Sequence, residues 1–189
     1  MKKMILILLT ICSLPFCLGC KSPKDKGIER IQEMMQKPIS IPFAKMSCCI
    51  NDTIQENRPW EDAKLKLIVY TDSNSCSECT LKRLYLWNDF VQLEPKYEGK
   101  FAIIFIFQTT KRSDAHLFAS KFHMSELEHP MYIDSNSEFE KNNPHIPNES
   151  FFHVFLLDEN NNVILVGSPL FDSKIEDSLN NLVKEKTGL

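Results

Sequence analysis

Glycine is scarce in this chain, with five residues among 189, and neither sign of charge dominates. With 43% hydrophobic and 25% charged residues, the composition excludes collagen-like, low-complexity and wholly disordered chains and is typical of one globular domain. Lys and Arg number 22 against 25 Asp and Glu, a net charge of -3, so the chain lacks the basic field that holds nucleic acid. Nucleic acid is therefore not an expected partner.

The amino terminus has the layout of an export signal. A short basic start, 1–3, precedes the almost wholly apolar run 4–18, which is too short for a comfortable transmembrane span. The leader ends in Cys17-Leu18-Gly19-Cys20, which resembles the lipobox of bacterial lipoproteins, although Cys17 stands where that family usually has Leu. The resemblance implies that residues 1–19 are a lipoprotein signal peptide, cut before Cys20, and that Cys20 carries the lipid anchor. Ordinary secretion with cleavage nearby is the alternative.

The resemblance to lipoproteins also implies a location. A lipid on Cys20 would attach the protein to a membrane of the cell envelope, and Lys21, in place of Asp, favours the outer membrane with the domain facing the periplasm. Loss of the signal removes Cys12 and Cys17, and a domain of this length buries roughly 70% of its unfolded surface without a disulfide framework. The cysteines left for chemistry are Cys48, Cys49, Cys76 and Cys79. Outside the cytosol a close pair of them is expected to be oxidised or to cycle.

Two short segments are expected to connect the signal to the main domain. Residues 20–38 read as a tether with a weakly amphipathic helix over 21–37, which lies on an anionic membrane surface, packs on its own domain or is disordered. In the extension 39–63, apolar residues alternate from 39 to 43 and predict a short edge strand, because Pro42 is excluded from a central strand.

The main domain, residues 64–189, reads as alternating strands and helices. Strands are predicted at 65–70, 101–107, 131–133, 151–157 and 163–166, of which the last two form a hairpin pattern. Helices are predicted at 76–94, at 113–122 and from Ser173, where Glu176 completes a capping box. This order predicts an α/β fold with a central mixed sheet and helices on both faces.

Cys76-Ser77-Glu78-Cys79 lies at the turn from the first central strand into the first long helix. A thiol at a helix amino terminus ionises more easily than a free one, so Cys76 is the expected nucleophile. Cys79, almost one turn further along, is expected to be shielded and to close a disulfide, which is the geometry that thiol-disulfide exchange requires. Glu78 disfavours a thiolate here, whereas Lys82 and Arg83 favour one.

The order of strand, CxxC, long helix, apolar strand, late hairpin and terminal helix resembles the thioredoxin fold. The export signal makes the chain similar to extracytoplasmic thioredoxin-like thiol-disulfide oxidoreductases of the TlpA type, over residues 64–189. The segments Phe155-Leu156-Leu157-Asp158 and Asn162-Val163-Ile164 also resemble that family's penultimate strand, turn and last strand. The resemblance implies Cys76 as attacking thiol and Cys79 as resolving thiol. It further implies protein thiols or disulfides as clients, an upstream redox partner and no cofactor.

Three positions depart from the thioredoxin pattern. Ser75 precedes the first cysteine where Trp is usual, and Leu84 stands where a kinking Pro is frequent. Phe152 takes the position of the cis-proline that faces the disulfide in the family, so substrate docking on that loop is not implied. Pro147 is a candidate for a displaced equivalent.

Cys48 and Cys49 are adjacent, and consecutive Cα atoms lie about 3.8 Å apart, below the roughly 4.4 Å of relaxed disulfides. On an extended segment they point to opposite faces, so one is expected in the core and the other exposed. Three roles are open for them: they are inert packing residues, they are accessory thiols that exchange with the CxxC motif, or they form a disulfide with a partner or bind a metal. A zinc site from all four cysteines is disfavoured because adjacent ligands lack a spacer.

Other functions remain open at this level. The CxxC motif is compatible with a static disulfide in a non-catalytic thioredoxin-like binding or scaffold lipoprotein. Ser73, three residues before Cys76, faintly resembles the Thr-x-x-Cys of peroxiredoxins, and a CxxC motif with a distant histidine is compatible with copper delivery. His153, in an apolar run, is expected to be a core histidine with its hydrogen bonds satisfied, and no metal site is predicted.

Overall fold

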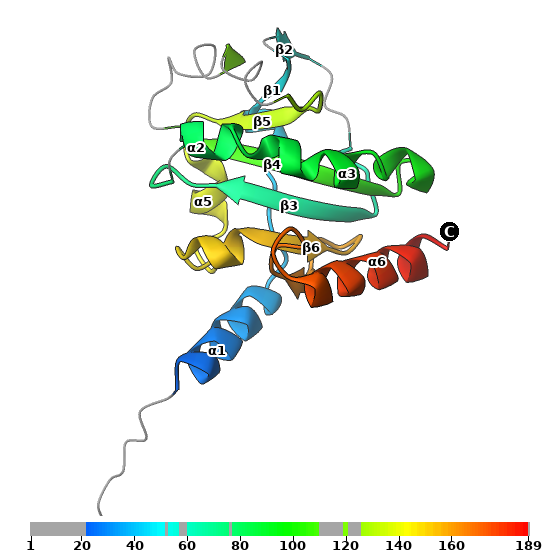
Figure 1. Cartoon of the computed structure of the whole chain (residues 1–189). Coiled ribbons are helices and arrows are strands. Elements are labelled where there is room, and N and C mark those ends of the chain that lie inside the picture. The colour runs from blue at the N-terminus through cyan, green and yellow to red at the C-terminus, as the bar shows by residue number, and fades with distance from the viewer. Residues whose placement is uncertain are drawn as a thin grey trace, which may run out of the picture.

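The computed structural model describes residues 22–51, 53–56, 60–75, 77–109, 119–120 and 126–188 (Figure 1). Within these residues, seven strands form one sheet in the order β2-β1-β5-β4-β3-β6-β7. The strands are β1 Ser47–Ile50, β2 Thr53–Gln55, β3 Leu65–Thr71, β4 Phe101–Gln108, β5 Met131–Asp134, β6 Val154–Leu157 and β7 Val163–Val166. The α-helices are α1 Pro23–Met35, α2 Ser77–Leu81, α3 Asn88–Val91, α5 Glu138–Asn142 and α6 Ser173–Thr187. The 3₁₀ helices are η1 Phe43–Lys45, η2 Leu84–Trp87, η3 Glu94–Tyr97 and η5 Ser150–His153.

The directions of the strands confirm the predicted thioredoxin-like fold. Strand β3 pairs in parallel with β4, which pairs in parallel with β5. On the other side of β3, β6 and β7 form an antiparallel hairpin that pairs with β3 through β6. The sheet is therefore mixed, as the order of elements predicted, and β3 lies near its middle with the cysteine motif at its carboxyl end.

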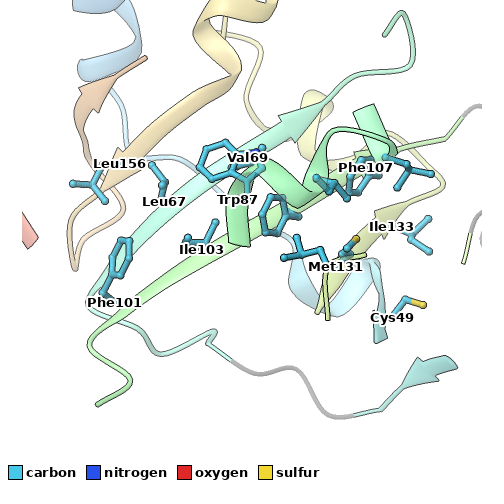
Figure 2. Packing of buried hydrophobic residues seen from close by; sticks show 14 of the residues in the cluster. Cys49, Leu67, Val69, Trp87, Phe101, Ile103, Phe107, Met131, Ile133 and Leu156 are labelled. Atoms are coloured by element: carbon cyan, nitrogen blue, oxygen red, sulfur yellow. The ribbon is translucent and has the colours of Figure 1, made fainter. Parts of the chain in front are cut away.

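The two central strands, β3 and β4, are buried along their whole length, which explains why their sequences are apolar except for Lys66, Thr71 and Gln108. On one face of the sheet, alternate side chains such as Val69 and Phe105 pack with Trp87 of η2 and Leu179 of α6. Figure 2 labels Val69 and Trp87 within this cluster. On the other face, the intervening side chains pack against Met34 of α1, Phe43 of η1 and Phe139 of α5. The prediction of helices on both faces is therefore confirmed.

The predicted edge strand at 39–43 is wrong. Ile39 and Phe43 are buried in the core, so their alternation reflects packing. The backbone in this segment bonds to other groups, since Ile39 N–H donates to the Asn161 carbonyl at 2.8 Å and Ser40 N–H to Asn143 Oδ1 at 2.8 Å. The extension instead adds β1 and β2 to the sheet, and β1 pairs antiparallel with β5.

The predicted amino-terminal helix is confirmed as α1. It begins with a capping box in which Ser22 Oγ accepts from Asp25 N–H at 3.2 Å, and it packs on the domain through the fully buried Met34. Figure 1 shows the rest of α1 projecting away from the sheet. No helix within the described residues is long and apolar enough to span a membrane.

The predicted continuous helix at 76–94 is wrong, because the segment is broken into α2, η2, α3 and η3. Arg83 N–H donates to the Thr80 carbonyl at 3.0 Å, an i to i+3 bond that marks the end of α2. The reason lies in the spacing of Leu81, Leu84 and Trp87, which all pack on the sheet. Three residues per turn keep such a row on one side, whereas 3.6 would rotate it away.

The carboxyl-terminal half also differs in detail from expectation. The hairpin is confirmed, but its first strand starts only at Val154, and residues 151–153 belong to η5. Helix α6 is confirmed, yet its cap is Asp172, whose Oδ1 accepts from Lys174 N–H at 2.9 Å, so the predicted capping box at Ser173 is wrong. The predicted helix at 113–122 lies outside the described residues except for 119–120.

Candidate functional site

A tight turn connects β3 to α2. Asp72, the first residue after β3, accepts two hydrogen bonds on Oδ1, from Ser75 N–H at 2.8 Å and from Ser75 Oγ at 2.6 Å. This Asx-type turn sets the direction in which the chain enters α2. Cys76, the predicted nucleophile, is the next residue and lies outside the described residues.

Cys79 lies in α2 and is disulfide-bonded. Neither Cys48 nor Cys49 forms a disulfide, so neither is its partner. The prediction that Cys79 is shielded is wrong, because its side chain is exposed. Cys79 is the third residue of α2, so it lies in the first turn of the helix, with its side chain at the surface.

A groove of about 690 Å³ opens beside Cys79. Four parts of the chain form it: the end of β3, the segment α2–η2, η5, and the connection between β7 and α6. Three large apolar side chains on its walls are exposed, namely Leu86 (37%), Phe151 (63%) and Phe171 (77%). Sequence reasoning missed these residues as functional candidates. For Phe151 and Phe171, the sequence offers one signal: each is an aromatic residue close to polar residues in a connecting segment, before Val154 and before Ser173 respectively.

Charge in the groove comes from Arg83 and Asp172. Arg83, which follows the end of α2, is exposed and lines the groove, whereas Lys82 does not belong to its lining. The Asp172 carboxylate is already engaged as the cap of α6. Because α2 has only five residues, its aligned peptide dipoles stabilise a thiolate less than the long helix expected from the sequence would.

The loop that faces the disulfide in thioredoxins is here the helical turn η5. Phe152, at the position of the family's cis-proline, is buried in the core, and its N–H donates to the Glu149 carbonyl at 2.9 Å. All peptide bonds of the described residues are trans, including the one that precedes Pro147. Pro147 is therefore not a displaced cis-proline, and it serves through its carbonyl oxygen, which lies 3.0 Å from Nε2 of His153.

A buried polar cluster lies behind the groove around Tyr70. Tyr70 O–H donates to Gln108 Oε1, and Gln108 Nε2 donates to Glu140 Oε2 at 2.9 Å. Burial raises the pKa of the Tyr70 hydroxyl far above its ordinary value, and the negative charges of Glu140 and Asp72 add to this. His153 packs its ring against Tyr70 and is buried, as predicted, but only Nε2 has a hydrogen-bond partner.

Cys48 and Cys49 lie on β1 and point to opposite faces of the sheet, as predicted. The prediction that one of them is exposed is wrong, because their exposed fractions are 1% and 0%. The reason is that apolar side chains cover both faces of the sheet at β1, so that Cys49 packs in the cluster on one face and Cys48 in the cluster on the other. Figure 2 shows Cys49 near Met131 and Ile133, at a distance from Trp87. Both thiols therefore act as packing residues in this structure.

A second buried polar cluster lies away from the cysteine motif. Glu94 of η3 accepts from Ile103 N–H, and its Oε2 lies 3.0 Å from His129 Nε2. Trp60 stacks on the His129 ring at 4.6 Å. Within the described residues, no three side chains of the metal-ligating types gather into a site. Cys20, the predicted lipid attachment site, lies outside the described residues.

The sequence matches no protein-family model and no curated protein. Among solved structures, the chain is similar to a domain of a possible thiol-disulfide isomerase from Cytophaga hutchinsonii, at 14% identity over 82% of this chain and 97% of that chain, with a TM-score of 0.47. It is also similar to the thioredoxin domain of a thiol-disulfide oxidoreductase from Bacteroides vulgatus, at 16% identity over 65% and 81%, with a TM-score of 0.42. A third is the bacterioferritin comigratory protein of Xanthomonas campestris, at 15% identity over 79% and 98%, with a TM-score of 0.46. The thioredoxin-like fold of this chain rests on the order and directions of its own strands.

Proposed function

We propose that this protein carries out thiol-disulfide exchange through Cys76 and Cys79. The observation that carries the proposal is the disulfide at Cys79, exposed in the first turn of the helix that follows the central strand and open to a groove. Cys76 is the proposed partner because it is three residues away and because Cys48 and Cys49 form no disulfide. An exposed disulfide of this kind is labile, whereas structural disulfides are usually protected.

The proposed reaction proceeds in two displacements. A thiolate of the client attacks the sulfur of Cys76, the bond between Cys76 and Cys79 breaks, and Cys79 leaves as a thiolate that takes up a proton. A second client thiolate then attacks the client sulfur of the mixed disulfide and releases Cys76. The client loses two electrons and gains a disulfide, and the protein gains two electrons and becomes a dithiol. The reverse sequence reduces a client disulfide, and the potential of the redox partner sets the net direction.

The local geometry supports distinct tasks for the neighbouring residues. The turn closed by Asp72 and Ser75 orients the start of α2. Arg83 lines the groove as an exposed cation, and a positive charge near a leaving or attacking thiolate stabilises it. Trp87 and Leu84 hold the segment on the sheet, so the motif sits on a packed support.

We also propose that the protein is anchored in the cell envelope by a lipid on Cys20, with the domain in the periplasm and the outer membrane as its site. The support is the layout of the leader and the lipobox-like motif. Labelling of cells with a fatty-acid analogue should mark the wild type and leave Cys20→Ala unmarked. A labelled mutant, or a mature protein that starts elsewhere, contradicts the anchor.

Trapping tests the exchange reaction. The Cys79→Ser variant should accumulate mixed disulfides with clients through Cys76, because the resolving thiol is missing, and Cys76→Ala should abolish turnover. Cys48→Ala is the matched control and should retain turnover. Catalysis that survives Cys76→Ala contradicts the proposal, and a partner retained by the Cys76→Ala/Cys79→Ala double variant without turnover identifies a binding module instead.

The reduction potential provides an independent test. Equilibration with glutathione should place the couple between roughly -120 and -270 mV, the range of working exchangers. A value well below about -300 mV is typical of an inert structural disulfide and contradicts the proposal.

A further inference from the structure

We infer that the groove beside Cys79 selects polypeptide clients that carry a large apolar side chain next to the reacting cysteine, through contacts with Phe151 and Phe171. This inference rests on the proposed exchange function and adds to it a substrate class and two specificity residues. It differs from recognition by strand pairing, in which backbone hydrogen bonds supply the affinity.

The first observation is where exposed apolar surface gathers. Among the described residues, three of the six large apolar side chains that remain exposed line this groove, and they come from three separate elements. Phe151 projects from η5 at 63% exposure, Phe171 from the connection between β7 and α6 at 77%, and Leu86 from η2 at 37%. Apolar side chains that cluster in a concave site mark a surface that is covered in a complex.

The second observation concerns the backbone around the groove, where the N–H groups of Phe152 and Gly167 are engaged within the chain. Phe152 N–H donates to the Glu149 carbonyl at 2.9 Å, within the turn that carries Phe151. Gly167 N–H donates to the Val154 carbonyl at 2.8 Å. Strand β6 is paired on both sides, by β3 and β7. Because these backbone groups are engaged and β6 has no open edge, the groove presents side chains to a client, and we infer that side-chain contacts supply most of the affinity.

The size and charge of the groove define the client further. A volume of about 690 Å³ is in the range of sites that take a drug-sized group or a few residues, well beyond a single small thiol. Arg83 is exposed in the lining, while Asp172 is engaged by the backbone of α6. The favoured client is therefore an apolar segment with a carboxylate within reach of Arg83.

The inference is tested by the reaction of three synthetic peptides with the reduced full-length protein. All three contain a glutamate and one cysteine that is linked by a disulfide to glutathione. The first has phenylalanine directly before the cysteine, and the second has alanine there. The third is the phenylalanine peptide with N-methylated peptide bonds on both sides of the cysteine. The second-order rate constant of exchange is measured for each, with glutathione disulfide as the small reference substrate.

The phenylalanine peptide should react about tenfold faster than the alanine peptide, the effect expected of one well-packed aromatic contact. N-methylation should leave this preference in place. Phe151→Ser and Phe171→Ser should each reduce the ratio of the two peptide rates severalfold, and thermal unfolding should show both variants folded. Tyr85→Ser is the matched control, since Tyr85 is 50% exposed on η2 and does not line the groove, and it should keep the wild-type ratio.

Two results overturn the inference while exchange itself stands. The first is equal rates for the phenylalanine and alanine peptides, and the second is loss of the rate on N-methylation, which would assign recognition to backbone pairing. Failure of the wild type to react with every peptide and with glutathione disulfide overturns the proposed function together with this inference.

Discussion

Asp72 closes the turn that leads from β3 into the cysteine motif, and Asp72→Ala tests how much this turn contributes to stability and exchange. The substitution removes two hydrogen bonds, from Ser75 N–H at 2.8 Å and from Ser75 Oγ at 2.6 Å. A hydrogen bond to a charged group contributes about 1.5–3 kcal/mol when it is buried, and partial exposure of this turn reduces that value. We therefore expect the free energy of unfolding to fall by about 2 kcal/mol for the pair.

Asp72→Asn is the matched control because it separates geometry from charge. The side-chain oxygen of asparagine can accept both bonds from Ser75, and asparagine is favoured in turns of this type. We expect this variant to lose less than about 1 kcal/mol. It should also exchange thiols at close to the wild-type rate, whereas Asp72→Ala should be slower because the start of α2 is no longer oriented.

Urea unfolding followed by tryptophan fluorescence measures the first effect, since Trp87 is buried against the sheet. The rate of glutathione disulfide reduction by the fully reduced protein measures the second. If Asp72→Ala unfolds within about 0.5 kcal/mol of the wild type, or if Asp72→Asn is as unstable as Asp72→Ala, the turn does not act through these two bonds. Equal exchange rates for all three proteins would show that the turn does not position the motif.

Three further predictions concern the buried groups. Glu94→Ala should lower the free energy of unfolding by about 3 kcal/mol, because it leaves the buried Ile103 N–H and His129 Nε2 without Glu94 as a partner. Urea unfolding measures this loss, and a value below about 1 kcal/mol would contradict the prediction. Tyr70 has a raised pKa in the folded state, so its contribution to stability is full below pH about 10 and declines above it. Unfolding measured between pH 8 and 11 should therefore show a steeper loss for the wild type than for Tyr70→Phe, and parallel curves would refute the assignment. Because Cys48 and Cys49 are both buried, they should resist alkylation by iodoacetamide in the folded, reduced protein and react after unfolding in urea. Peptide mapping measures this alkylation, and rapid alkylation of either thiol in the folded protein would show that β1 opens.

Much of the fold follows from local patterns in the sequence. The mainly apolar runs at β3 and β4 favour burial on both faces, and burial on both faces requires a central position in a sheet covered by helices. The place of the CxxC motif, directly after one of these runs, puts it at the carboxyl end of the central strand. Helix α6 and its apolar stripe follow from the 3.6-residue period, and the hairpin follows from the polar turn at Asp158.

Other features depend on contacts between residues far apart in the sequence. The segment predicted as one long helix is broken because a row of apolar residues spaced by three must stay on the sheet, and that demand outweighs local preference for an α-helix. The alternation at 39–43 is compatible with a strand by itself, but the carbonyl of Asn161 and the side chain of Asn143 bind this backbone instead. Cys48 and Cys49 are both buried because distant apolar residues cover both faces of the sheet at β1.

The groove is also a product of tertiary structure. Its walls come from η2, η5 and the connection before α6, which are widely separated in the chain and meet only because β3 pairs with β6. The cysteine motif could be recognised from four consecutive residues, because its chemistry is local. Phe151 and Phe171 could not be recognised in this way, because an exposed aromatic side chain acquires a function only from the distant residues that it faces across a groove.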